Sequence, residues 1–314
     1  MAKTEAPAAA RRKLAHASLL GIEQLETDDI TAILRLAKRF QRARPRPLFK
    51  EKRVALLFYE ASTRTRISFE FAAKVLGATT TIVHPTASSV EKGESLVDTG
   101  LTIRALGAQV MIIRHPSSGA PHMLARHVDV PVINAGDGMH EHPSQALLDA
   151  FTILQHKKTL HGLRVAIVGD IYHSRVARSE VYLLSRFGAK VMLCGPPELA
   201  PDSAATLAPG VQVTRNVGEA LRGADVVMVL RIQKERLAGR QIGVEQYIAQ
   251  YQVTPERLKF AKRDAILMHP GPIIRGMELT GELADARQSV VLQQVANGVP
   301  VRMAILARAL EIRV

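Results

Sequence analysis

Two patterns of apolar residues alternate along this chain. Short continuous apolar runs, as at residues 54–58 and 165–168, are typical of strands that are buried on both faces. Stretches such as residues 30–40 instead place apolar side chains three or four positions apart, which is the period of an amphipathic helix. Strand and helix alternate in both halves of the sequence, so we predict an α/β protein with two parallel-sheet domains of similar size.

The predicted domain limits follow from where this alternation begins, restarts and ends. Residues 1–15 are rich in Ala, Pro, Lys and Arg without an apolar period, and we predict a disordered basic tail. We predict a first domain over residues 16–150 and a second over residues 151–289. Residues 290–314 are predicted to form a helix that returns to the first domain and is interrupted near Pro300.

Composition limits the classes of function. Of the 314 residues, 47% are hydrophobic and 23% charged, and no apolar run approaches the roughly 20 residues of a membrane span, so we expect no membrane partner. Residues 1–13 lack the apolar segment of a secretory signal, and we expect a cytoplasmic location. The single cysteine, Cys194, lies in an apolar run, which excludes internal disulfides and cysteine-based zinc sites.

The charge raises the question of nucleic-acid binding, because 42 basic against 29 acidic residues give a net charge of +13. The chain has no tryptophan and only 4% aromatic residues, and its Lys and Arg residues are dispersed. We therefore expect no nucleic-acid partner. A surplus of separate arginines beside turns suits a protein that gathers several small anionic groups.

The sequence Ser-Thr-Arg-Thr-Arg lies between a predicted strand and a predicted helix. Its hydroxyl groups can cap that helix, and two guanidinium groups stand beside the free N–H groups of the first turn. Cations there oppose the helix dipole unless an anion joins them, so we predict a phosphate-binding turn. Its residues are Ser62, Thr63, Arg64, Thr65 and Arg66.

Further polar motifs follow other predicted strands. In open α/β sheets ligands bind beyond the carboxyl ends of the strands, so these motifs are candidates for one ligand site. They are residues 114–116 (Arg-His-Pro), residues 142–145 (His-Pro-Ser-Gln), Arg175, residues 231–233 (Arg-Ile-Gln) and residues 269–272 (His-Pro-Gly-Pro).

Together these motifs, in this order, resemble the catalytic chain of aspartate carbamoyltransferases. The resemblance extends from about residue 16 to the C-terminus and is carried by residues 62–66 with 69–70, 92–95, 114–116, 142–149, 231–236 and 269–272. It implies transfer of the carbamoyl group of carbamoyl phosphate to L-aspartate, giving N-carbamoyl-L-aspartate and phosphate in pyrimidine biosynthesis. It also implies that the active site occupies the cleft between a carbamoyl phosphate-binding domain and an aspartate-binding domain.

The resemblance implies a role for each matching residue. Those implied to bind carbamoyl phosphate are Ser62, Thr63, Arg64, Thr65, Arg114, His142, Gln145, Pro270, Gly271 and Pro272. Those implied to bind aspartate are Lys92, Arg175, Arg231 and Gln233, and the catalytic group would be Arg64, Thr65, Lys92, Arg114 and His142. Carbamoyl phosphate is already activated, so we expect no metal, cofactor or covalent nucleophile, and the enzyme must hold two anions together and stabilise charge on a carbonyl oxygen.

The resemblance also implies an assembly. Lys92 would reach the site of a neighbouring subunit, so we expect a homotrimer or a higher oligomer built from trimers. Chains with the His-Pro-Gly-Pro form of the last motif resemble those that assemble with a dihydroorotase or a dihydroorotase-like chain, which makes such a chain a possible partner.

Three alternative functions are separable. Ornithine carbamoyltransferases share the fold and the phosphate half, but they use a His-Cys-Leu-Pro segment where this chain has residues 269–272, without cysteine. A nucleotide-dependent oxidoreductase would need a G-x-G-x-x-G sequence after the strand at residue 165, and this chain lacks it. A non-catalytic assembly subunit would have no reason to keep every ligand-facing residue.

Overall fold

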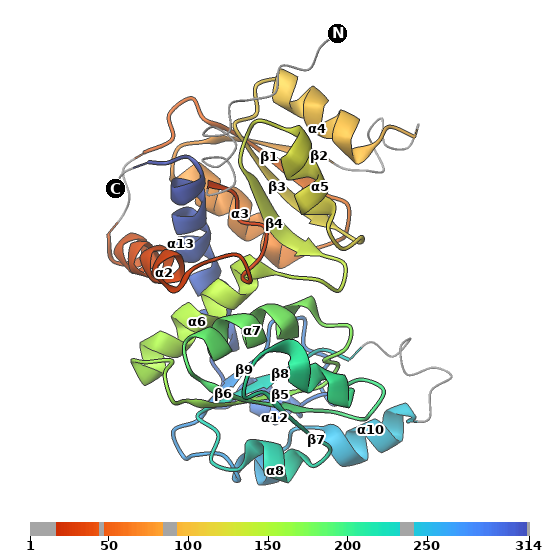
Figure 1. Cartoon of the computed structure of the whole chain (residues 1–314). Coiled ribbons are helices and arrows are strands. Elements are labelled where there is room, and N and C mark those ends of the chain that lie inside the picture. Colours follow the sequence, from red (N-terminus) through yellow and green to blue (C-terminus); the bar gives the residue numbers. More distant parts are fainter. Residues whose placement is uncertain (1–16, 44–46, 84–92, 233–241, 313–314) are drawn as a thin grey trace. The chain divides into compact units, whose positions relative to one another are not determined.

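The computed structural model describes residues 17–43, 47–83, 93–232 and 242–312 (Figure 1). The chain divides into two compact units. The first comprises residues 1–144 and 298–314, and the second comprises residues 145–297. Each unit is built on one parallel sheet, so the predicted fold class of two parallel α/β domains is confirmed.

The first unit contains a four-stranded parallel sheet in the order β2-β1-β3-β4. The strands are β1 (Arg53–Phe58), β2 (Thr79–Val83), β3 (Val110–His115) and β4 (Val132–Asp137). The helices of this unit are α2 (Thr27–Arg42), α3 (Thr63–Val75), α4 (Leu96–Ala105) and α5 (Ala120–His127). Both β2 and β4 are edge strands of this sheet. Strand β2 is partly exposed, whereas β4 is buried throughout, because α5 packs on it and Leu19 pairs with its outer edge.

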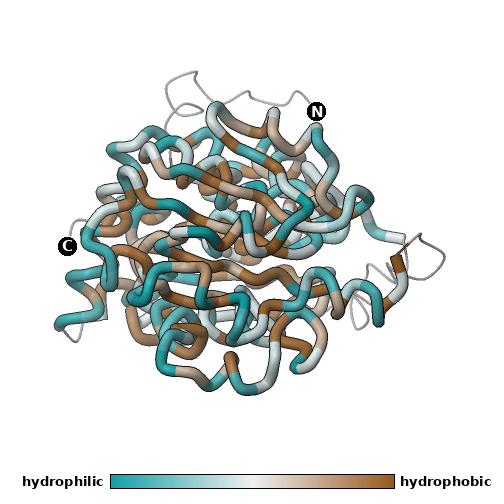
Figure 2. Tube along the Cα trace, turned by 90° about the horizontal axis from the view of Figure 1, so that it is seen from below, coloured by the Kyte–Doolittle hydropathy of each residue, from teal (hydrophilic) through white to brown (hydrophobic). Residues whose placement is uncertain are grey.

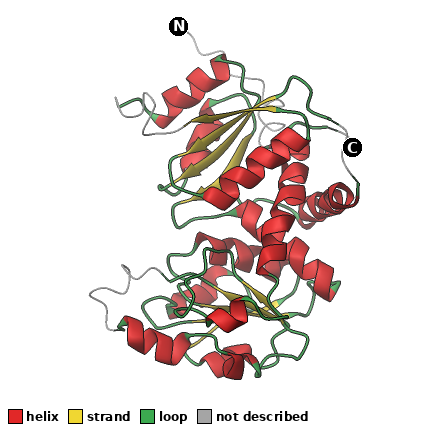
Figure 3. Cartoon of the chain, turned by 180° about the vertical axis from the view of Figure 1, so that it is seen from behind, coloured by secondary structure: helices red, strands yellow, loops and turns green. Residues whose placement is uncertain are grey.

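The second unit contains a five-stranded parallel sheet in the order β7-β6-β5-β8-β9. The strands are β5 (Arg164–Val168), β6 (Lys190–Cys194), β7 (Gln212–Thr214), β8 (Val226–Val229) and β9 (Ile266–Met268). The helices are α6 (Pro143–Lys157), α7 (Arg175–Arg186), the 3-10 helix η3 (Asp202–Leu207), α8 (Val217–Leu221), α10 (Val244–Tyr251), α11 (Pro255–Leu258) and α12 (Gly281–Ala284). The last helix, α13 (Val291–Ala309), begins in the second unit and belongs to the first from residue 298 onward. Figure 3 shows helices on both sides of the strands in each unit.

The cores lie between the sheets and these helices. In the first unit Leu57, Ile113 and Val132 from three strands pack with Leu124 of α5. The second unit has a corresponding cluster in which Val168 and Val229 pack with Tyr247 of α10. In Figure 2 apolar segments run through the middle of the trace and hydrophilic segments form many of the outer turns, as expected for sheets covered on both faces.

Cys194 is buried in the core of the second unit, at the end of β6. Burial raises the pKa of its thiol to about 12. The thiol is therefore un-ionised and unreactive at neutral pH, in agreement with its prediction as a core residue.

Pro300 lies inside α13, which continues past it without the interruption that we expected. A proline within a helix costs about 3 kcal/mol because it removes one hydrogen bond and crowds the preceding turn. Val301, Ile305 and Leu306, which follow it in the same helix, are all buried. Packing of this apolar face outweighs the local preference of proline.

No helix among the described residues is both long enough and apolar enough to cross a membrane.

Candidate active site

The first part of the candidate site is the turn between β1 and α3. Ser62 is the N-cap residue of α3, in an extended conformation, but its side chain makes no capping hydrogen bond, so the prediction of a hydroxyl cap is wrong at this residue. Thr63 and Arg64 are exposed and Thr65 is buried, and the first turn contains no acidic residue. The first turn of α3 thus carries hydroxyl and guanidinium groups and no acidic residue of its own, which suits a phosphate.

Arg114 lies beside this turn because β1 and β3 are neighbouring strands. Phe58 and Arg114 pair in the sheet, and the Tyr59 N–H donates to the Arg114 carbonyl oxygen at 2.9 Å. The Arg114 side chain is only 12% exposed, and it donates to the Ala135 carbonyl oxygen at 3.3 Å and to Glu60 Oε1 at 3.4 Å. These contacts hold the guanidinium at the carboxyl edge of the sheet.

His142 follows β4 at the same edge. The chain reverses after the strand, and the Asp137 N–H donates to the Glu141 carbonyl oxygen at 3.1 Å. The His142 side chain is buried, with Nδ1 at 3.5 Å from Ser144 Oγ. The structure therefore gathers the turn of α3, Arg114 and His142 at one edge of the first sheet, as the strand-end argument predicts.

The second unit gathers its own set of predicted residues. Strands β5, β8 and β9 are neighbours in the sheet, and all three are parallel. Arg175 is the first residue of α7 after β5, and the exposed Arg231 follows β8. Pro270, Gly271 and Pro272 follow β9. Two arginines and a turn with accessible backbone thus stand at one edge of the second sheet.

The His269 ring fixes the turn after β9. This ring is buried, and its Nδ1 accepts a hydrogen bond from the Gly271 N–H at 2.8 Å. Its Nε2 lies 3.1 Å from Glu278 Oε1, so the tautomer that satisfies both contacts carries its proton on Nε2. Glu278 also accepts from the Ile274 N–H at 2.6 Å. His269 therefore shapes the turn from inside.

Gln145, near the start of α6, is oriented by a buried carboxylate. Its Nε2 donates to both carboxylate oxygens of Asp149, at 3.0 and 3.1 Å. Gln294 of α13 donates to the same carboxylate at 2.8 Å, and its own Oε1 accepts from the His269 N–H at 2.9 Å. Since Nε2 of Gln145 is engaged by Asp149, its Oε1 is the atom that can accept a hydrogen bond from a substrate NH₂ group.

Two predicted residues, Lys92 and Gln233, lie outside the described residues.

Comparison with known proteins identifies the family. The family model described as the carbamoyl-P binding domain of aspartate/ornithine carbamoyltransferase matches residues 17–155. The model described as the Asp/Orn binding domain of the same family matches residues 161–309. The chain belongs to the aspartate/ornithine carbamoyltransferase family.

Individual relatives agree with this assignment. The chain is 67% identical to the aspartate carbamoyltransferase catalytic subunit of Koribacter versatilis, over 92% of this chain and 95% of that protein. It is also similar to the crystal structure of aspartate transcarbamoylase from Trypanosoma cruzi in complex with carbamoyl aspartate and phosphate, with a TM-score of 0.85 and 32% identity over 93% and 95% of the two chains. The ornithine carbamoyltransferase from Thermus thermophilus gives the same TM-score, 0.85, at 28% identity over 94% and 99%. Backbone similarity therefore does not separate aspartate-type from ornithine-type carbamoyltransferases.

Sequence reasoning missed the residues that orient this carbamoyltransferase site from behind. Asp149 stands within a motif that carried the resemblance, but we assigned it no role. No sequence pattern indicated Gln294 or Glu278. Gln294 acts through a contact with Asp149, which is remote in the chain, and Glu278 acts through a contact with His269 inside a turn. A buried carboxylate or amide surrounded by apolar sequence is the pattern that could have indicated them.

A second buried carboxyl group, that of Glu180 on α7, lies next to Asp149. Burial raises the pKa of Glu180 well above its usual range, and the charge of Asp149 and a hydrogen bond with it act in the same direction. Glu180 therefore keeps its proton in the folded protein at pH values where the unfolded chain has lost it. Below a pH of about 4.3, the pKa of this group in the unfolded chain, the proton contributes its full stabilisation. That contribution is lost as the pH rises through the raised pKa of the folded state.

Glu180→Gln replaces the protonated carboxyl with an amide of similar shape that cannot ionise. We expect the free energy of unfolding of the variant, relative to the wild type, to increase as the pH is raised from about 5 toward the raised pKa of the folded state. Urea unfolding at a series of pH values measures the difference, and Glu245→Gln, which removes an exposed carboxylate from α10, is the matched control. A difference for Glu180→Gln that stays constant with pH would show that this carboxyl is ionised in the folded state.

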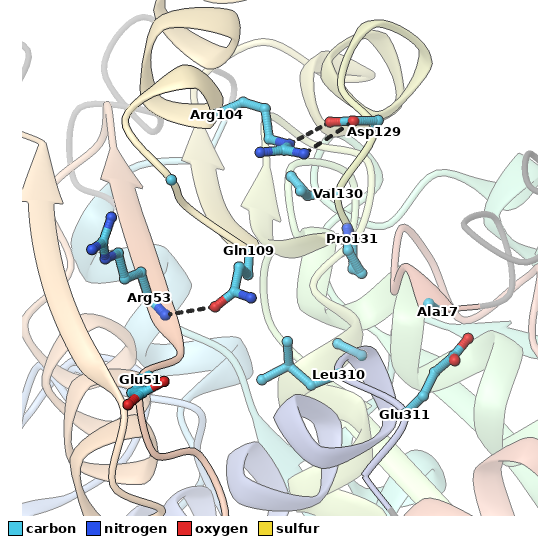
Figure 4. A pocket seen from close by; sticks show the side chains of 12 residues that line it. Ala17, Glu51, Arg53, Arg104, Gln109, Asp129, Val130, Pro131, Leu310 and Glu311 are labelled. Carbon is cyan, nitrogen blue, oxygen red and sulfur yellow. Dashed lines mark hydrogen bonds and ion pairs between the residues drawn. The ribbon is translucent and has the colours of Figure 1, made fainter. Parts of the chain in front are cut away.

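A cavity of about 720 Å³ lies in the first unit, away from the candidate site (Figure 4). Its lining includes Arg53, Gln109 and Pro131, which stand at the amino ends of β1, β3 and β4. Arg104 forms an ion pair with Asp129 at its rim. The predicted site residues of this carbamoyltransferase stand at the carboxyl ends of the same strands, so the cavity is not part of the candidate active site.

Proposed function

We propose that this chain transfers the carbamoyl group of carbamoyl phosphate to the amine of L-aspartate, giving N-carbamoyl-L-aspartate and phosphate. The observation that carries the choice of L-aspartate is the pair Arg175 and Arg231, which follow the neighbouring strands β5 and β8. Two guanidinium groups match a dicarboxylate and oppose the cationic side chain of ornithine. The 67% identity to an aspartate carbamoyltransferase catalytic subunit supports the same choice and a place in pyrimidine biosynthesis. We propose that the protein acts in the cytoplasm.

In this proposal the first unit binds the phosphate group. The N–H groups of the first turn of α3 and the hydroxyls of Ser62, Thr63 and Thr65 donate to phosphate oxygens. Arg64 and Arg114 add charge-assisted hydrogen bonds. Because Arg114 is held by Glu60 and Ala135, little side-chain freedom is lost when the phosphate binds.

The carbamoyl group is held at its two ends. His142, Thr65 and Arg114 donate to its carbonyl oxygen, where negative charge develops as the amine attacks. Gln145 Oε1 accepts a hydrogen bond from its NH₂ group. The backbone at Pro270 and Gly271 contacts the same NH₂ group, and Pro272 completes that turn. The site thus distinguishes the oxygen of the carbamoyl group from its nitrogen.

The reaction needs no group beyond these. The aspartate amine forms a bond to the carbamoyl carbon, the carbon–oxygen bond to phosphate breaks, and the departing phosphate takes the proton that the amine loses. Arg175, Arg231, Gln233 and Lys92 bind the two carboxylates of aspartate and place its amine against the carbonyl carbon. Positioning and electrostatic stabilisation supply the rate enhancement.

We further propose a homotrimer, or a higher oligomer of trimers, in which Lys92 enters the site of the neighbouring subunit. A dihydroorotase-like chain is the expected further partner. Purification from native extract under mild conditions tests this partner, and recovery of a single chain type at trimer mass would contradict it.

The experiment that tests the proposed function measures product formation with carbamoyl phosphate and either L-aspartate or L-ornithine. We expect kcat/KM for aspartate to exceed that for ornithine by at least about 10⁴-fold, because the site would otherwise leave paired arginines facing a cation. Comparable rates would assign the chain to the ornithine type. No product with either amine, from a folded protein, would favour a non-catalytic assembly subunit.

His142→Ala is expected to lower kcat by about 10- to 100-fold, with a smaller change in the dissociation constant for phosphate. The loss is at the lower end for one donor because Thr65 and Arg114 donate to the same oxygen. Steady-state kinetics and phosphate binding measure the two quantities separately. An unchanged kcat would make His142 a structural residue.

A further inference from the structure

Three potential metal ligands outside the proposed active site converge in the first unit. His122 lies on α5, Asp137 ends β4, and His140 lies in the turn that follows β4. One ligand atom of each residue lies within 4.8 Å of the ligand atoms of the other two. The convergence follows from the fold, because α5 packs against β4.

Asp137 is held rigidly at the centre of this group. It is fully buried, and the Gly119 N–H donates to its Oδ2 at 2.7 Å. Asn134 Nδ2 and the Glu141 N–H donate to its Oδ1 at 2.7 and 3.1 Å. A carboxylate fixed in this way does not have to be ordered when a cation binds.

His140 and Asp137 have the arrangement that supports a metal-binding imidazole. His140 Nδ1 lies 3.1 Å from Asp137 Oδ2, a separation that one Zn²⁺ ion bound to both atoms at about 2.0–2.2 Å can span. The ion takes the place of the proton between these two atoms, so Nδ1 is the ligand atom of His140.

His122 completes the group and has an unused nitrogen. Its Nε2 lies 2.7 Å from Gln24 Nε2, and exchanging the amide atoms of Gln24 makes the histidine the donor. Its Nδ1 is buried and has no hydrogen-bond partner among the described residues. The ring stands edge-on to that of His140, with centroids 5.5 Å apart. A buried polar atom without a partner costs about 1–3 kcal/mol, which a bound ion would offset.

The surrounding charges favour a cation. The carboxylates of Asp137, Glu141 and Glu23 act on His140, whereas Arg126 is the cation that acts on His122. Two imidazole nitrogens and one carboxylate oxygen are the ligand types that Zn²⁺ accepts, while Mg²⁺ and Ca²⁺ prefer oxygen ligands only.

We propose that His122, Asp137 and His140 form a binding site for one Zn²⁺ ion per chain, with a fourth position open to water. Gln24 acts as the outer hydrogen-bond partner that orients the His122 ring. The ion joins α5 to the turn after β4, so its binding stabilises the folded state of the first unit. The site is independent of the proposed carbamoyl transfer, since none of its ligands has a role in that reaction.

The test is titration of the full-length, chelator-treated protein with Zn²⁺, followed by calorimetry and by thermal unfolding. We expect one equivalent per chain and a rise in Tm. His122→Gln and His140→Gln should each weaken the binding by at least about 10-fold, and Gln24→Ala by about 10- to 100-fold, as for other partners of metal-binding histidines. His127→Gln is the matched control, because His127 lies on the same helix, is exposed and contacts the Met123 carbonyl oxygen.

Co²⁺ provides a second readout that does not depend on stability. We expect visible absorption bands from bound Co²⁺ in the wild type and in His127→Gln, and their loss in His122→Gln. Retention of the bands in His142→Ala separates this site from the proposed active site. If the wild type binds no more Zn²⁺ or Co²⁺ than His122→Gln does, or if His127→Gln lowers the binding equally, the proposal is wrong.

Discussion

Arg64→Ala is expected to reduce kcat/KM for carbamoyl phosphate by about 10²-fold or more, equivalent to roughly 3 kcal/mol of transition-state stabilisation. Arg64 is exposed in the first turn of α3, next to Thr63. In the proposed reaction its charge acts on the phosphate bound at this turn and on the charge that develops as the phosphate departs. Steady-state kinetics with varied carbamoyl phosphate measure the loss.

The control for this prediction is Lys74→Ala, which removes a cation from the other end of the same helix. Lys74 forms a surface ion pair with Glu70 at 2.6 Å, and such pairs contribute about 1 kcal/mol or less to stability. We expect its activity to match the wild type. The Tm of Arg64→Ala checks that the fold is intact, and near wild-type turnover in that variant would refute the assignment of the phosphate-binding turn.

The fold was predictable because buried parallel strands leave a strong signal. Residues 54–58 and 165–168 are continuous apolar runs, and both are strands covered by helices in the structure. Predictions of local details, such as helix caps and helix breaks, were less reliable. Ser62 occupies the N-cap position of α3 but makes no capping bond, and α13 continues past Pro300. At Pro300 the packing of the buried residues that follow it decides the outcome, and a local pattern does not contain that packing.

The residues of the candidate site also fall into those that the sequence could predict and those that it could not. The residues proposed to face the substrates stand after strands, where the topology of a parallel sheet brings them together, so their positions could be anticipated. The residues that orient them could not. The contact of Asp149 with Gln294 spans 145 residues of sequence, and the Zn²⁺ ligand His122 meets His140 only because α5 packs on β4. Such pairings depend on packing between elements.

The buried network around Asp149 also explains why the amide of Gln145 has one orientation. Gln145 and Gln294 each donate to the carboxylate through an amide nitrogen, so the amide oxygens of these two side chains point elsewhere. One of them fixes the backbone of His269 at the start of the turn that contains Pro270. A single carboxylate thus relates two groups that we propose to contact the same carbamoyl NH₂.

The second large effect concerns sharing of the active site between subunits. Arg64→Ala trimers and Lys92→Ala trimers are each expected to be nearly inactive. When the two kinds of chain are dissociated, mixed in equal amounts and reassembled, we expect about 25% of wild-type activity to return. In the proposed trimer a site needs Arg64 from one chain and Lys92 from its neighbour, and random assembly of a cyclic trimer supplies both at one interface in four.

A matched mixture separates this explanation from any general effect of reassembly. Arg64 and Arg114 stand at the same edge of one sheet, so we propose that every site takes both from a single chain. Arg64→Ala chains mixed with Arg114→Ala chains should therefore stay inactive, because no chain in that mixture carries both arginines. If the mixture with Lys92→Ala is equally inactive although trimers have re-formed, Lys92 acts within its own subunit or outside the site. Recovery of activity in the mixture of Arg64→Ala with Lys92→Ala chains, and not in the mixture with Arg114→Ala chains, would establish that the active site is shared.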